Sequence, residues 1–380
     1  MTGSNNNATD KLQEFRIIFE SALSSIHKRT GGESTTPQRC IILSGGVDTC
    51  AIMAASKRIG MSYAAALTVV TGDNSPDLGF SAACAQEYGL THHIIRLSAE
   101  ELVSQFLPDV VKQLKIYNGM LIRNSLVIAA VFKRASELGF TDAVVGDGAD
   151  ELFGGYSFMW GSAEDPTEWK NKRDAMCAHW TFSTEELASM YNMRQHSPYM
   201  EPQLVDWAIA NTERHDCIGD RPIRLFYGED TQDHTTGKII LREAYETVSS
   251  WRRKDPIEVG SGATVIGHDA YWKNHISDQD FEQEVAELQN RGYQIHNKEQ
   301  LANFREFKKC FGLDGQNGAD IKRLLIGQGC VDCCFDIGDK MFCHMCGAYP
   351  AQRSKAETHY YDNDLRKLVA KEETTQKARE

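Results

Sequence analysis

Apolar side chains follow two alternating patterns along the first part of the chain. Short, nearly continuous apolar runs, typical of strands that are buried on both faces, occur at 41–43, 63–70, 92–97 and 142–146. Between and before these runs lie stretches with the three-to-four spacing or the end signals of helices, at 11–28, 50–60, 78–89, 98–114 and 123–138. The pattern therefore predicts strands and helices in turn.

This alternation predicts an α/β fold class, a doubly wound and mostly parallel sheet with helices on both faces. Beyond Tyr156 the strand pattern fades, and helices are expected at 183–191, 201–211 and 236–251. From about residue 280 the chain becomes more polar. We expect four parts: a tail and helix at 1–35, the main domain at 36–270, a mainly helical extension at 271–325, and a cysteine-rich metal-binding module with a charged tail at 326–380.

The composition of the 380 residues, with 41% hydrophobic and 25% charged residues, is that of a soluble globular protein. The sequence has no apolar stretch of the ~20 residues that a membrane helix needs. The first ten residues are polar and lack the regions of a secretory signal, so we expect a cytoplasmic protein. The net charge of -12 repels phosphate backbones, which favours small-molecule substrates over nucleic acid.

The stretch Ser-Gly-Gly-Val-Asp-Thr at 44–49 follows the first predicted strand. Glycines let backbone N–H groups approach an anion, the following helix adds its positive end, and Ser44 and Thr49 add hydroxyl groups. The stretch lacks the Gly-Lys-Ser/Thr ending of a Walker loop. A tight strand-to-helix turn is the alternative, but the carboxylate of Asp48 favours a phosphate site that also holds Mg2+.

A second glycine-rich loop, Gly-Asp-Gly-Ala-Asp-Glu-Leu-Phe-Gly-Gly-Tyr at 146–156, also follows an apolar strand. It carries three acids, and a calcium-like or merely solvated turn is the alternative interpretation. Because the exits of neighbouring parallel strands meet at one edge of a sheet, Asp150 is expected to complete a two-carboxylate Mg2+ site with Asp48. Asp147 is then left facing the reacting group.

Together, these two loops closely resemble the synthetase domain of the asparagine synthetase family, whose N-type ATP pyrophosphatase fold also serves beta-lactam synthetases and lasso-peptide cyclases. The resemblance extends to Asn-Ser-Pro-Asp at 74–77, to Leu-Ile-Arg-Asn-Ser at 121–125 and to Gly-Lys-Ile-Ile-Leu-Arg at 237–242, and it covers roughly residues 10–265. It implies a sheet of the adenine nucleotide alpha hydrolase-like type.

The resemblance implies an ATP-dependent ligase that adenylates a carboxylate, releases pyrophosphate on Mg2+ and forms an amide with ammonia or another amine. It assigns pyrophosphate and metal to Ser44, Gly45, Gly46, Asp48, Thr49 and Asp150, and adenosine to Ile42, Val70 and Gly146. Lys238 would neutralise charge on the reacting phosphate. Arg123 is a candidate clamp for phosphate or carboxylate, and Asp147 is either a base or a substrate contact.

The sequence departs from the family in two places. Glutamine-dependent members begin with a glutaminase domain, whereas this chain reaches its ATP loop at Ser44. We therefore expect the nitrogen to come from free ammonia, from another amine, or from a separate glutaminase or carrier protein, without channelling inside this chain. In the substrate-side motif, His196, Tyr199 and Glu201 replace Arg, Phe and Asp, which puts an aspartate substrate in doubt. The oligomeric state stays open, with a homodimer among the alternatives.

Five cysteines crowd into residues 330–346. Two Cys-x2-Cys pairs supply four thiolates for a tetrahedral Zn2+ ion, namely Cys330, Cys333, Cys343 and Cys346. Cys334 and His344 are alternative ligands. An iron–sulfur cluster, or cysteines that act in redox chemistry or carry sulfur, are alternatives to structural zinc.

Two other functions compete with the amide-forming ligase. The first is a sulfur-inserting or other nucleotide-activating transferase that uses Cys334 or a thiol of the cluster. The second is a non-catalytic ATP-binding scaffold whose zinc module binds a partner. The acidic charge of the chain and the loop at 146–156, which resembles that of amide-forming members, argue against the transferase. The acids and Lys238 argue against the scaffold.

Overall fold

The computed structural model describes residues 3–31, 38–72, 75–160, 165–318 and 321–352, so the predicted charged tail beyond 352 lies outside the described residues. The described chain forms two compact units. The first unit contains residues 1–106 and 123–265, and the second contains residues 107–122 and 266–380. The division into four parts stays a prediction.

A parallel sheet of five strands lies at the centre of the first unit, in the order β3-β2-β1-β4-β5. The strands are β1 (Arg39–Ile42), β2 (Ala66–Thr71), β3 (His92–Leu97), β4 (Asp142–Val144) and β5 (Arg194–His196). The predicted fold class is confirmed. The chain builds outward from β1 to β3 and then returns to the other side of β1, so the direction of winding reverses between β1 and β4.

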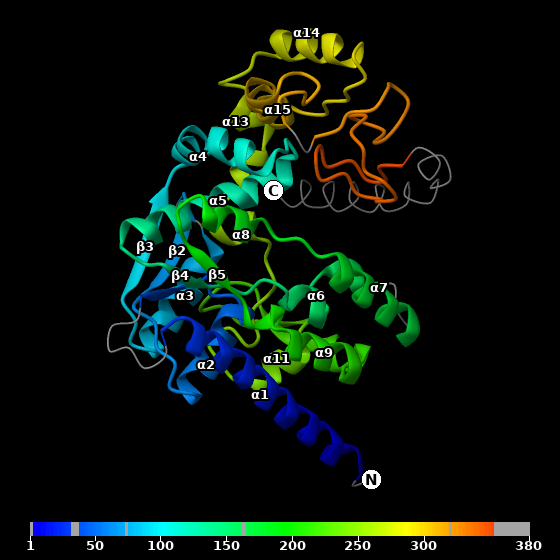
Figure 1. Ribbon diagram of the computed structural model, residues 1–380. Helices are drawn as coiled ribbons and strands as arrows, with labels where there is room; N and C mark the ends of the chain where they lie inside the picture. Colours follow the sequence, from blue (N-terminus) through cyan, green and yellow to red (C-terminus); the bar gives the residue numbers. More distant parts are fainter. Residues whose placement is uncertain (1–2, 32–37, 73–74, 161–164, 319–320, 353–380) are drawn as a thin grey trace. The chain divides into compact units, whose positions relative to one another are not determined.

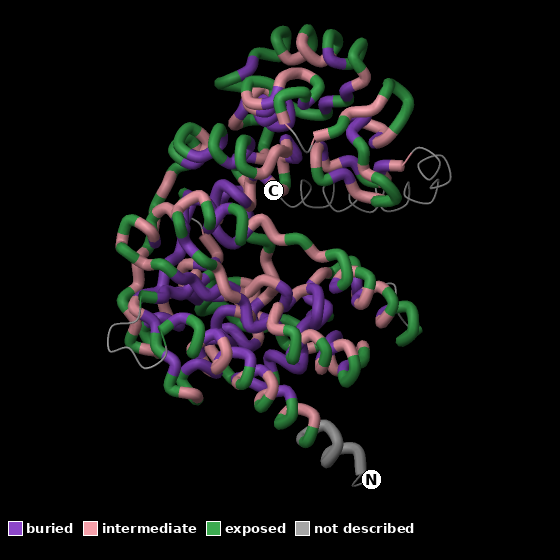
Figure 2. Tube along the Cα trace, in the orientation of Figure 1, coloured by how far each residue is buried: buried purple, intermediate pink, exposed green. Residues whose placement is uncertain are grey.

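Helices follow the strands as the apolar pattern predicts (Figure 1). They are α2 (Val47–Arg58), α3 (Pro76–Glu87), α4 (Ala99–Leu114) and α5 (Gly119–Glu137). The central strands are almost entirely buried, which Figure 2 shows as the purple interior of the unit. Their β-branched and aliphatic side chains suit a sheet that is covered on both faces.

The long helix α1 (Gly3–Arg29) packs its apolar side against α2, α9 (Pro202–Asn211) and α11 (Ile239–Ala244). The rings of Phe15 and Phe19 stack at 5.6 Å, and Phe19 lies 5.1 Å from the ring of Tyr199. Both phenylalanines are completely buried. This aromatic cluster holds α1 against the later part of the first unit, which contains Tyr199.

Most of the remaining elements of the first unit are short, and α7 is the exception. They comprise α6 (Ala149–Phe153), η1 (Ser157–Met159), α7 (Pro166–His179), α8 (Ser183–Ser189), η2 (Pro198–Met200), α10 (Arg214–Cys217), α12 (Ile257–Ser261) and η3 (Ala263–Gly267), whose last two residues are counted with the second unit. An antiparallel hairpin is formed by β6 (Gly219–Arg224) and β7 (Thr231–Thr236).

Two expectations for this part of the chain are wrong. Strands do continue beyond Tyr156, because β5, β6 and β7 are present, but their exposed polar residues give no apolar run to detect. The helix expected at 236–251 is limited to α11, which begins after Lys238 and ends at Ala244. Lys238 has a φ of 62° and cannot continue a regular helix backward.

The second unit contains α13 (Asp269–Trp272), α14 (Asp278–Gln289), α15 (Lys298–Phe311) and an irregular cysteine-rich segment. Helix α15 is buried along most of its length, with Phe304 and Phe307 packed on Tyr117. A helical C-terminal part with a cysteine cluster agrees with the predicted fold class. Among the described residues, no helix combines the length and the apolar character that a membrane span needs.

Candidate functional site

The loop at 44–49 joins β1 to α2, at the point where the winding of the sheet reverses. Gly45 has a φ of 69°, and a Cβ atom there would lie 2.4 Å from the backbone nitrogen of Ser81. Only glycine fits this position. Gly46 precedes the first turn of α2, which has no side-chain cap, so its N–H groups can bind an anion.

The acidic loop at 146–156 touches the first loop. A Cβ atom on Gly146 would lie 3.0 Å from Cβ of Asp48. Gly148 and Gly154, which flank the short helix α6, both adopt left-handed backbone conformations. A Cβ atom on Gly155 would overlap Asp150 Oδ1 at 1.9 Å, so the backbone passes directly beside that carboxylate.

Lys238 joins the two loops. Its ammonium nitrogen lies 2.7 and 2.6 Å from the two carboxylate oxygens of Asp48, and 2.8 Å from Oδ1 of Asp150. The side chain of Lys238 is completely buried, and its backbone N–H donates to the carbonyl oxygen of Phe153 at 2.8 Å. The structure thus brings together the two acids and the lysine that the sequence singles out.

Segment 249–255 contributes three further side chains to the site around Lys238. The hydroxyl of Ser249 donates to the carbonyl oxygen of Gly45 at 2.6 Å. Arg252 donates to the carbonyl oxygen of Ser44 at 3.1 Å and forms a buried ion pair with Asp77.

Lys254 completes the group, with Nζ lying 3.0 Å from Oδ2 of Asp150. Sequence reasoning missed Ser249, Arg252 and Lys254. The signal that was available is the run Arg-Arg-Lys at 252–254, which is unusual in so acidic a chain.

Two acids of the site, Asp147 and Asp150, have pKa values that are shifted in opposite directions. Burial disfavours the ionised form of Asp150, but the ammonium groups of Lys238 and Lys254 outweigh it and lower the pKa of this carboxyl below its usual range. Burial raises the pKa of Asp147 to about 6, and the charges of Asp150 and Asp48 add to this rise. Asp147 therefore titrates near neutral pH, whereas Asp150 stays ionised.

The other residues of the predicted site lie on the surrounding elements. Ile42 ends β1 and Val70 lies near the end of β2, so both are at the carboxyl edge of the sheet. Ser44 and Thr49 face each other, with 3.5 Å between their hydroxyl oxygens. Arg123 lies near the start of α5, where its neighbour Asn124 accepts a hydrogen bond from the backbone of Glu258.

The three replaced positions of the substrate-side motif have different surroundings. The hydroxyl of Tyr199 donates to the carbonyl oxygen of Asp48 at 2.9 Å and so supports the first loop. His196 pairs with Asp142 at 2.8 Å, and Glu201 pairs with Arg29. Among these three side chains, Tyr199 is therefore the one in direct contact with residue 48.

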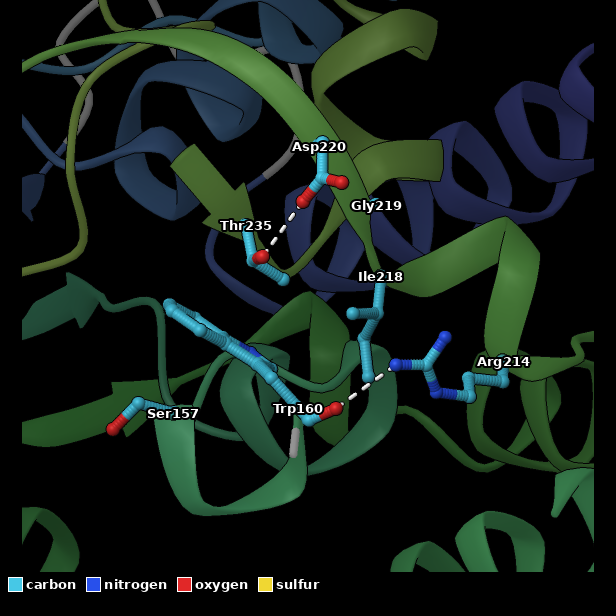
Figure 3. Close-up of a pocket in the computed structure, with 7 residues that line it drawn as sticks. All are labelled: Ser157, Trp160, Arg214, Ile218, Gly219, Asp220 and Thr235. Atoms are coloured by element: carbon cyan, nitrogen blue, oxygen red, sulfur yellow. Dashed lines mark hydrogen bonds between the residues drawn. The ribbon is translucent and has the colours of Figure 1, made fainter. Parts of the chain in front are cut away.

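A pocket of about 450 Å³ lies beside the acidic loop, as Figure 3 shows for its lining residues. Trp160 forms one wall, and its indole N–H donates to the carbonyl oxygen of Gly154 at 2.8 Å. The guanidinium of Arg214 donates to the carbonyl oxygen of Trp160 at 2.9 Å. The lining combines apolar, hydroxyl and charged groups: Ser157, Trp160, Arg214, Ile218, Gly219, Asp220 and Thr235.

In the second unit, four cysteines converge on one point. The Sγ atoms of Cys330 and Cys346 are 3.6 Å apart, and those of Cys333 and Cys343 are 3.7 Å apart. All four sulfur atoms lie within 4.8 Å of one another and all four residues are buried. We call this group the cysteine tetrad. Such a set of soft sulfur ligands fits a metal ion.

The two alternative ligands lie outside the tetrad. Cys334 is buried, and its thiol points to the carbonyl oxygen of Gly292 at 3.5 Å. The ring of His344 packs against the ring of Phe342 at 5.2 Å. The Cys-x2-Cys spacing therefore identified the converging thiols, and the two additional candidates do not join them.

Comparison with known proteins supports one family. Residues 34–201 match the family model described as asparagine synthase. A probable glutamine-hydrolyzing asparagine synthetase of Dictyostelium discoideum is 24% identical over 223 residues, which is 55% of this chain and 38% of that protein. Asparagine synthetase B of Escherichia coli K12, also glutamine-hydrolyzing, is 24% identical over 250 residues, or 60% of this chain and 42% of that protein.

This chain thus spans about two fifths of the length of these relatives. Among solved structures, an NH3-dependent NAD synthetase from Campylobacter jejuni is 18% identical, with 46% of this chain and 76% of that chain covered and a TM-score of 0.28. The resemblance of the first unit to the asparagine synthetase family is confirmed by the family match and the relatives.

Proposed function

We propose, on the premise that residues 34–201 match the asparagine synthase family, that this protein is an ATP-dependent carbon–nitrogen ligase. It would adenylate a carboxylate, release pyrophosphate and transfer the acyl group to ammonia or another amine. The observation that carries this proposal is the contact of Lys238 with both Asp48 and Asp150 at the carboxyl edge of the sheet.

The loop at 44–49 is the proposed site for the pyrophosphate part of ATP. Its N–H groups and the positive end of α2 lie at the carboxyl end of β1, where the direction of winding of the sheet reverses. Open α/β sheets bind ligands at such a point. Adenosine would lie along the carboxyl ends of β1 and β2, beside Ile42 and Val70. The bond from Ser249 to Gly45 and the bond from Arg252 to Ser44 would hold this loop in one conformation.

Asp48 and Asp150 are the residues that would hold Mg2+. The fit is supported by chemistry, because both offer hard carboxylate oxygens and both come within hydrogen-bond distance of the same ammonium group. When bound, Mg2+ would neutralise the charge that develops on the departing pyrophosphate. Lys238 would then be free to exchange its carboxylate partners for phosphate oxygens.

The proposed reaction has two steps. An oxygen of the substrate carboxylate forms a bond to the α-phosphorus, and the bond between that phosphorus and the bridging oxygen breaks, so that pyrophosphate leaves. The amine nitrogen then bonds to the acyl carbon and AMP leaves. The ammonium groups of Lys238 and Lys254 would stabilise the negative charge of both transition states.

Asp147 would accept the proton that the amine loses in the second step. Its pKa of about 6 suits a general base that works near neutral pH. Arg123 stays a candidate clamp. The pocket bounded by Trp160 lies beside the same loop and offers space for a small polar substrate.

Zn2+ is the ion that we propose for the cysteine tetrad, because its four ligands are all sulfur and all buried. The competing transferase needs an accessible thiol, either Cys334 or a thiol of the cluster. Cys334 is buried beside Gly292, and the four cysteines of the tetrad are buried as well. The ligase is therefore the better supported function. A cytoplasmic location and a separate glutaminase partner stay predictions.

The test is exchange of labelled pyrophosphate into ATP in the presence of candidate carboxylic acids, followed by addition of ammonia or amines. We expect exchange that depends on the acid, and then AMP and an amide as products. Release of ADP and phosphate would contradict the proposal. Replacing Cys334 with serine serves as the control, since the ligase should keep its activity and a sulfur-inserting enzyme should lose it.

A further inference from the structure

Two lysines bind the carboxylate of Asp150, one at each oxygen. The ammonium nitrogen of Lys238 lies 2.8 Å from Oδ1, and that of Lys254 lies 3.0 Å from Oδ2. Lys238 comes directly after the hairpin of β6 and β7, whereas Lys254 lies further along the chain, in segment 249–255. The two ammonium groups are therefore brought to one carboxylate from separate parts of the chain.

Lys238 is held at the base of the hairpin by the acidic loop. Its backbone N–H donates to the carbonyl oxygen of Phe153 at 2.8 Å. A Cβ atom on Gly237 would overlap the carbonyl oxygen of Gly154 at 1.9 Å, so the chain that enters Lys238 lies directly on the loop. The position of Lys238 therefore depends on contacts of its own backbone.

Lys254 follows a short pairing between segment 249–255 and the end of β6. The backbone N–H of Arg224 donates to the carbonyl oxygen of Trp251 at 2.6 Å, and the N–H of Arg253 donates to the carbonyl oxygen of Arg224 at 2.9 Å. These bonds form a parallel bridge between Arg224 and Arg252. The second bond lies directly before Lys254, so the end of β6 fixes the backbone from which this ammonium group extends.

Other contacts hold the segment further from the lysine. The guanidinium of Arg242 in α11 donates to the carbonyl oxygen of Ser250 at 2.7 Å and to that of Arg252 at 2.8 Å. The two bonds to the first loop, described above, also come from residues no further along than Arg252. The pairing of Arg253 with β6 extends this support to the residue before Lys254.

The hairpin that carries this pairing is largely exposed to solvent. In β7 every residue before Thr236 is exposed, and in β6 the buried residue is Ile223. A two-stranded hairpin by itself is marginally stable at best in water. The end of β6 therefore needs contacts with the rest of the first unit to stay in one position.

Tyr227 supplies such a contact from the tip of the hairpin, residues 225–230. Its ring lies 5.3 Å from the ring of Phe80 in an edge-to-face arrangement. A Cβ atom on Gly79 would lie 2.6 Å from Cβ of Tyr227, so the tip rests directly on α3. The guanidinium of Arg224 donates to the carbonyl oxygen of Glu229 at 2.9 Å and ties the end of β6 to this tip.

The surface on which Tyr227 rests is a firm part of the site. Phe80 is completely buried, and the guanidinium of Arg252 lies over its ring at 4.6 Å. The backbone of Phe80 also lies against Gly45 of the first loop. The tip is thus anchored to the same helix that supports the proposed pyrophosphate loop.

We infer that Tyr227 is a positioning residue for Lys254. By anchoring the hairpin tip to α3, it holds the end of β6 in the place where it pairs with Arg253, and so keeps the ammonium group of Lys254 at Asp150. Its effect on the reaction rests on the proposed function, whereas the structural link does not. Lys238, which is held at the base of the hairpin, keeps its place without Tyr227.

Hydrogen–deuterium exchange of the purified full-length protein tests the structural link. Tyr227→Ala is compared with Phe226→Ala, because the two neighbours are similarly exposed, at 49% and 44%, but Phe226 faces the guanidinium of Arg253 and not α3. We expect the amide of Arg253 to exchange about tenfold faster or more in Tyr227→Ala than in Phe226→Ala. The amide of Lys238 should keep its wild-type rate in both. Equal rates for Arg253 would overturn the inference.

Gly79→Ala displaces the tip without removing the ring, and it keeps the link testable if Tyr227→Ala fails to fold. Alanine is the better helix former, so α3 itself is not weakened. The new methyl group would lie 2.6 Å from Cβ of Tyr227 and push the tip away. We expect the same faster exchange at Arg253. A wild-type rate there in Gly79→Ala would contradict the inference.

Kinetics show whether Tyr227 acts through Lys254. We expect Tyr227→Ala to lower kcat of pyrophosphate exchange by about tenfold with little change in KM for ATP, and Tyr227→Phe to keep the wild-type rate, because the ring makes the contact. In Lys254→Met, adding Tyr227→Ala should lower kcat no further. Effects that multiply would assign Tyr227 a role apart from Lys254.

The two kinds of measurement separate this inference from the ligase. A wild-type protein without pyrophosphate exchange would contradict the proposed function alone, since amide exchange at Arg253 would still decide whether Tyr227 holds the segment. Faster amide exchange in Tyr227→Ala together with an unchanged kcat would confirm the contact and overturn the positioning role.

Discussion

The ammonium of Lys238 lies 2.6 Å from a carboxylate oxygen of Asp48, although 190 residues separate the two in the chain. The contact spans the carboxyl edge of the sheet, since Asp48 follows β1 and Lys238 is held against the loop after β4 by its bond to Phe153. The same buried lysine also touches Asp150, and under the proposed function it would exchange these carboxylates for phosphate oxygens.

Replacing Lys238 with methionine should lower the rate of pyrophosphate exchange by about 100-fold or more, because one preorganised donor to the reacting phosphate is lost. The control is Lys298→Met, which removes another buried lysine, one that is paired with Asp278 in the second unit. Initial rates and melting temperatures of both variants are measured together. Equal exchange rates for the two would remove Lys238 from the mechanism.

Asp150→Asn should raise the Mg2+ concentration needed for half-maximal exchange by about tenfold or more, because a charged ligand is replaced by a neutral one. Asp220→Asn, which changes an acid of the Trp160 pocket, is the control and should leave the Mg2+ requirement unchanged. A titration of exchange rate against Mg2+ distinguishes the two variants. An unaltered requirement in Asp150→Asn would contradict the assigned ligand.

The pH dependence of amide formation should follow Asp147. A general base works in its ionised form, so the rate should fall as the pH drops through about 6, the pKa of this carboxyl. Asp147→Asn should lower the rate by about 100-fold or more and remove the acid limb of the profile. The profile is measured as kcat for amide formation between pH 5 and 8. An acid limb that persists in the variant would assign the proton transfer to another group.

Acid should also weaken the fold through Asp150. Its pKa is lowered in the folded state by Lys238 and Lys254 despite burial, so its charge stabilises the protein above its unfolded pKa of about 3.9. That contribution is lost as the pH falls through the lower, folded pKa. Urea unfolding of the wild type and of Asp150→Asn should show a smaller loss of stability with acid in the variant.

Gly45→Ala and Gly60→Ala should differ strongly. Both glycines have left-handed backbones, with φ values of 69° and 72°, so both substitutions carry a strain of about 1–2 kcal/mol. At Gly60 the new methyl group enters open space, whereas at Gly45 it would meet the backbone of Phe80 and Ser81. We expect Gly45→Ala to lose ATP binding and further unfolding free energy. Equal effects of the two substitutions would show that the loop can move aside.

The apolar pattern predicted the strands β1 to β4. Strands β1, β2 and β4 are largely buried, and strands that are covered on both faces need continuous apolar residues, whereas β3 is a partly exposed edge strand that was predicted from the stretch at 92–97. It missed β5, whose residues Arg194, Gln195 and His196 are polar and lie at the edge of the sheet. It also extended the helix at 236–251 too far, since the backbone conformation of Lys238 and the turn after Ala244 follow from contacts with distant loops.

The residues of the candidate site also fall into those that the sequence predicted and those that it did not. Asp48, Asp147 and Asp150 could be found in the sequence because each lies in a glycine-rich loop directly after a predicted strand. Lys254 and Arg252 are marked in the sequence only by the basic run at 252–254, which does not indicate that they turn back toward Asp150 and Ser44.

By itself, the sequence determined the parallel sheet, its two glycine-rich loops and the two cysteine pairs, because apolar periodicity, glycine spacing and Cys-x2-Cys turns are local properties of a chain. Only the tertiary structure decided which charges meet at Asp150 and which thiols converge. Those pairings join residues far apart in sequence, and they depend on how helices and turns pack once the strand order is set.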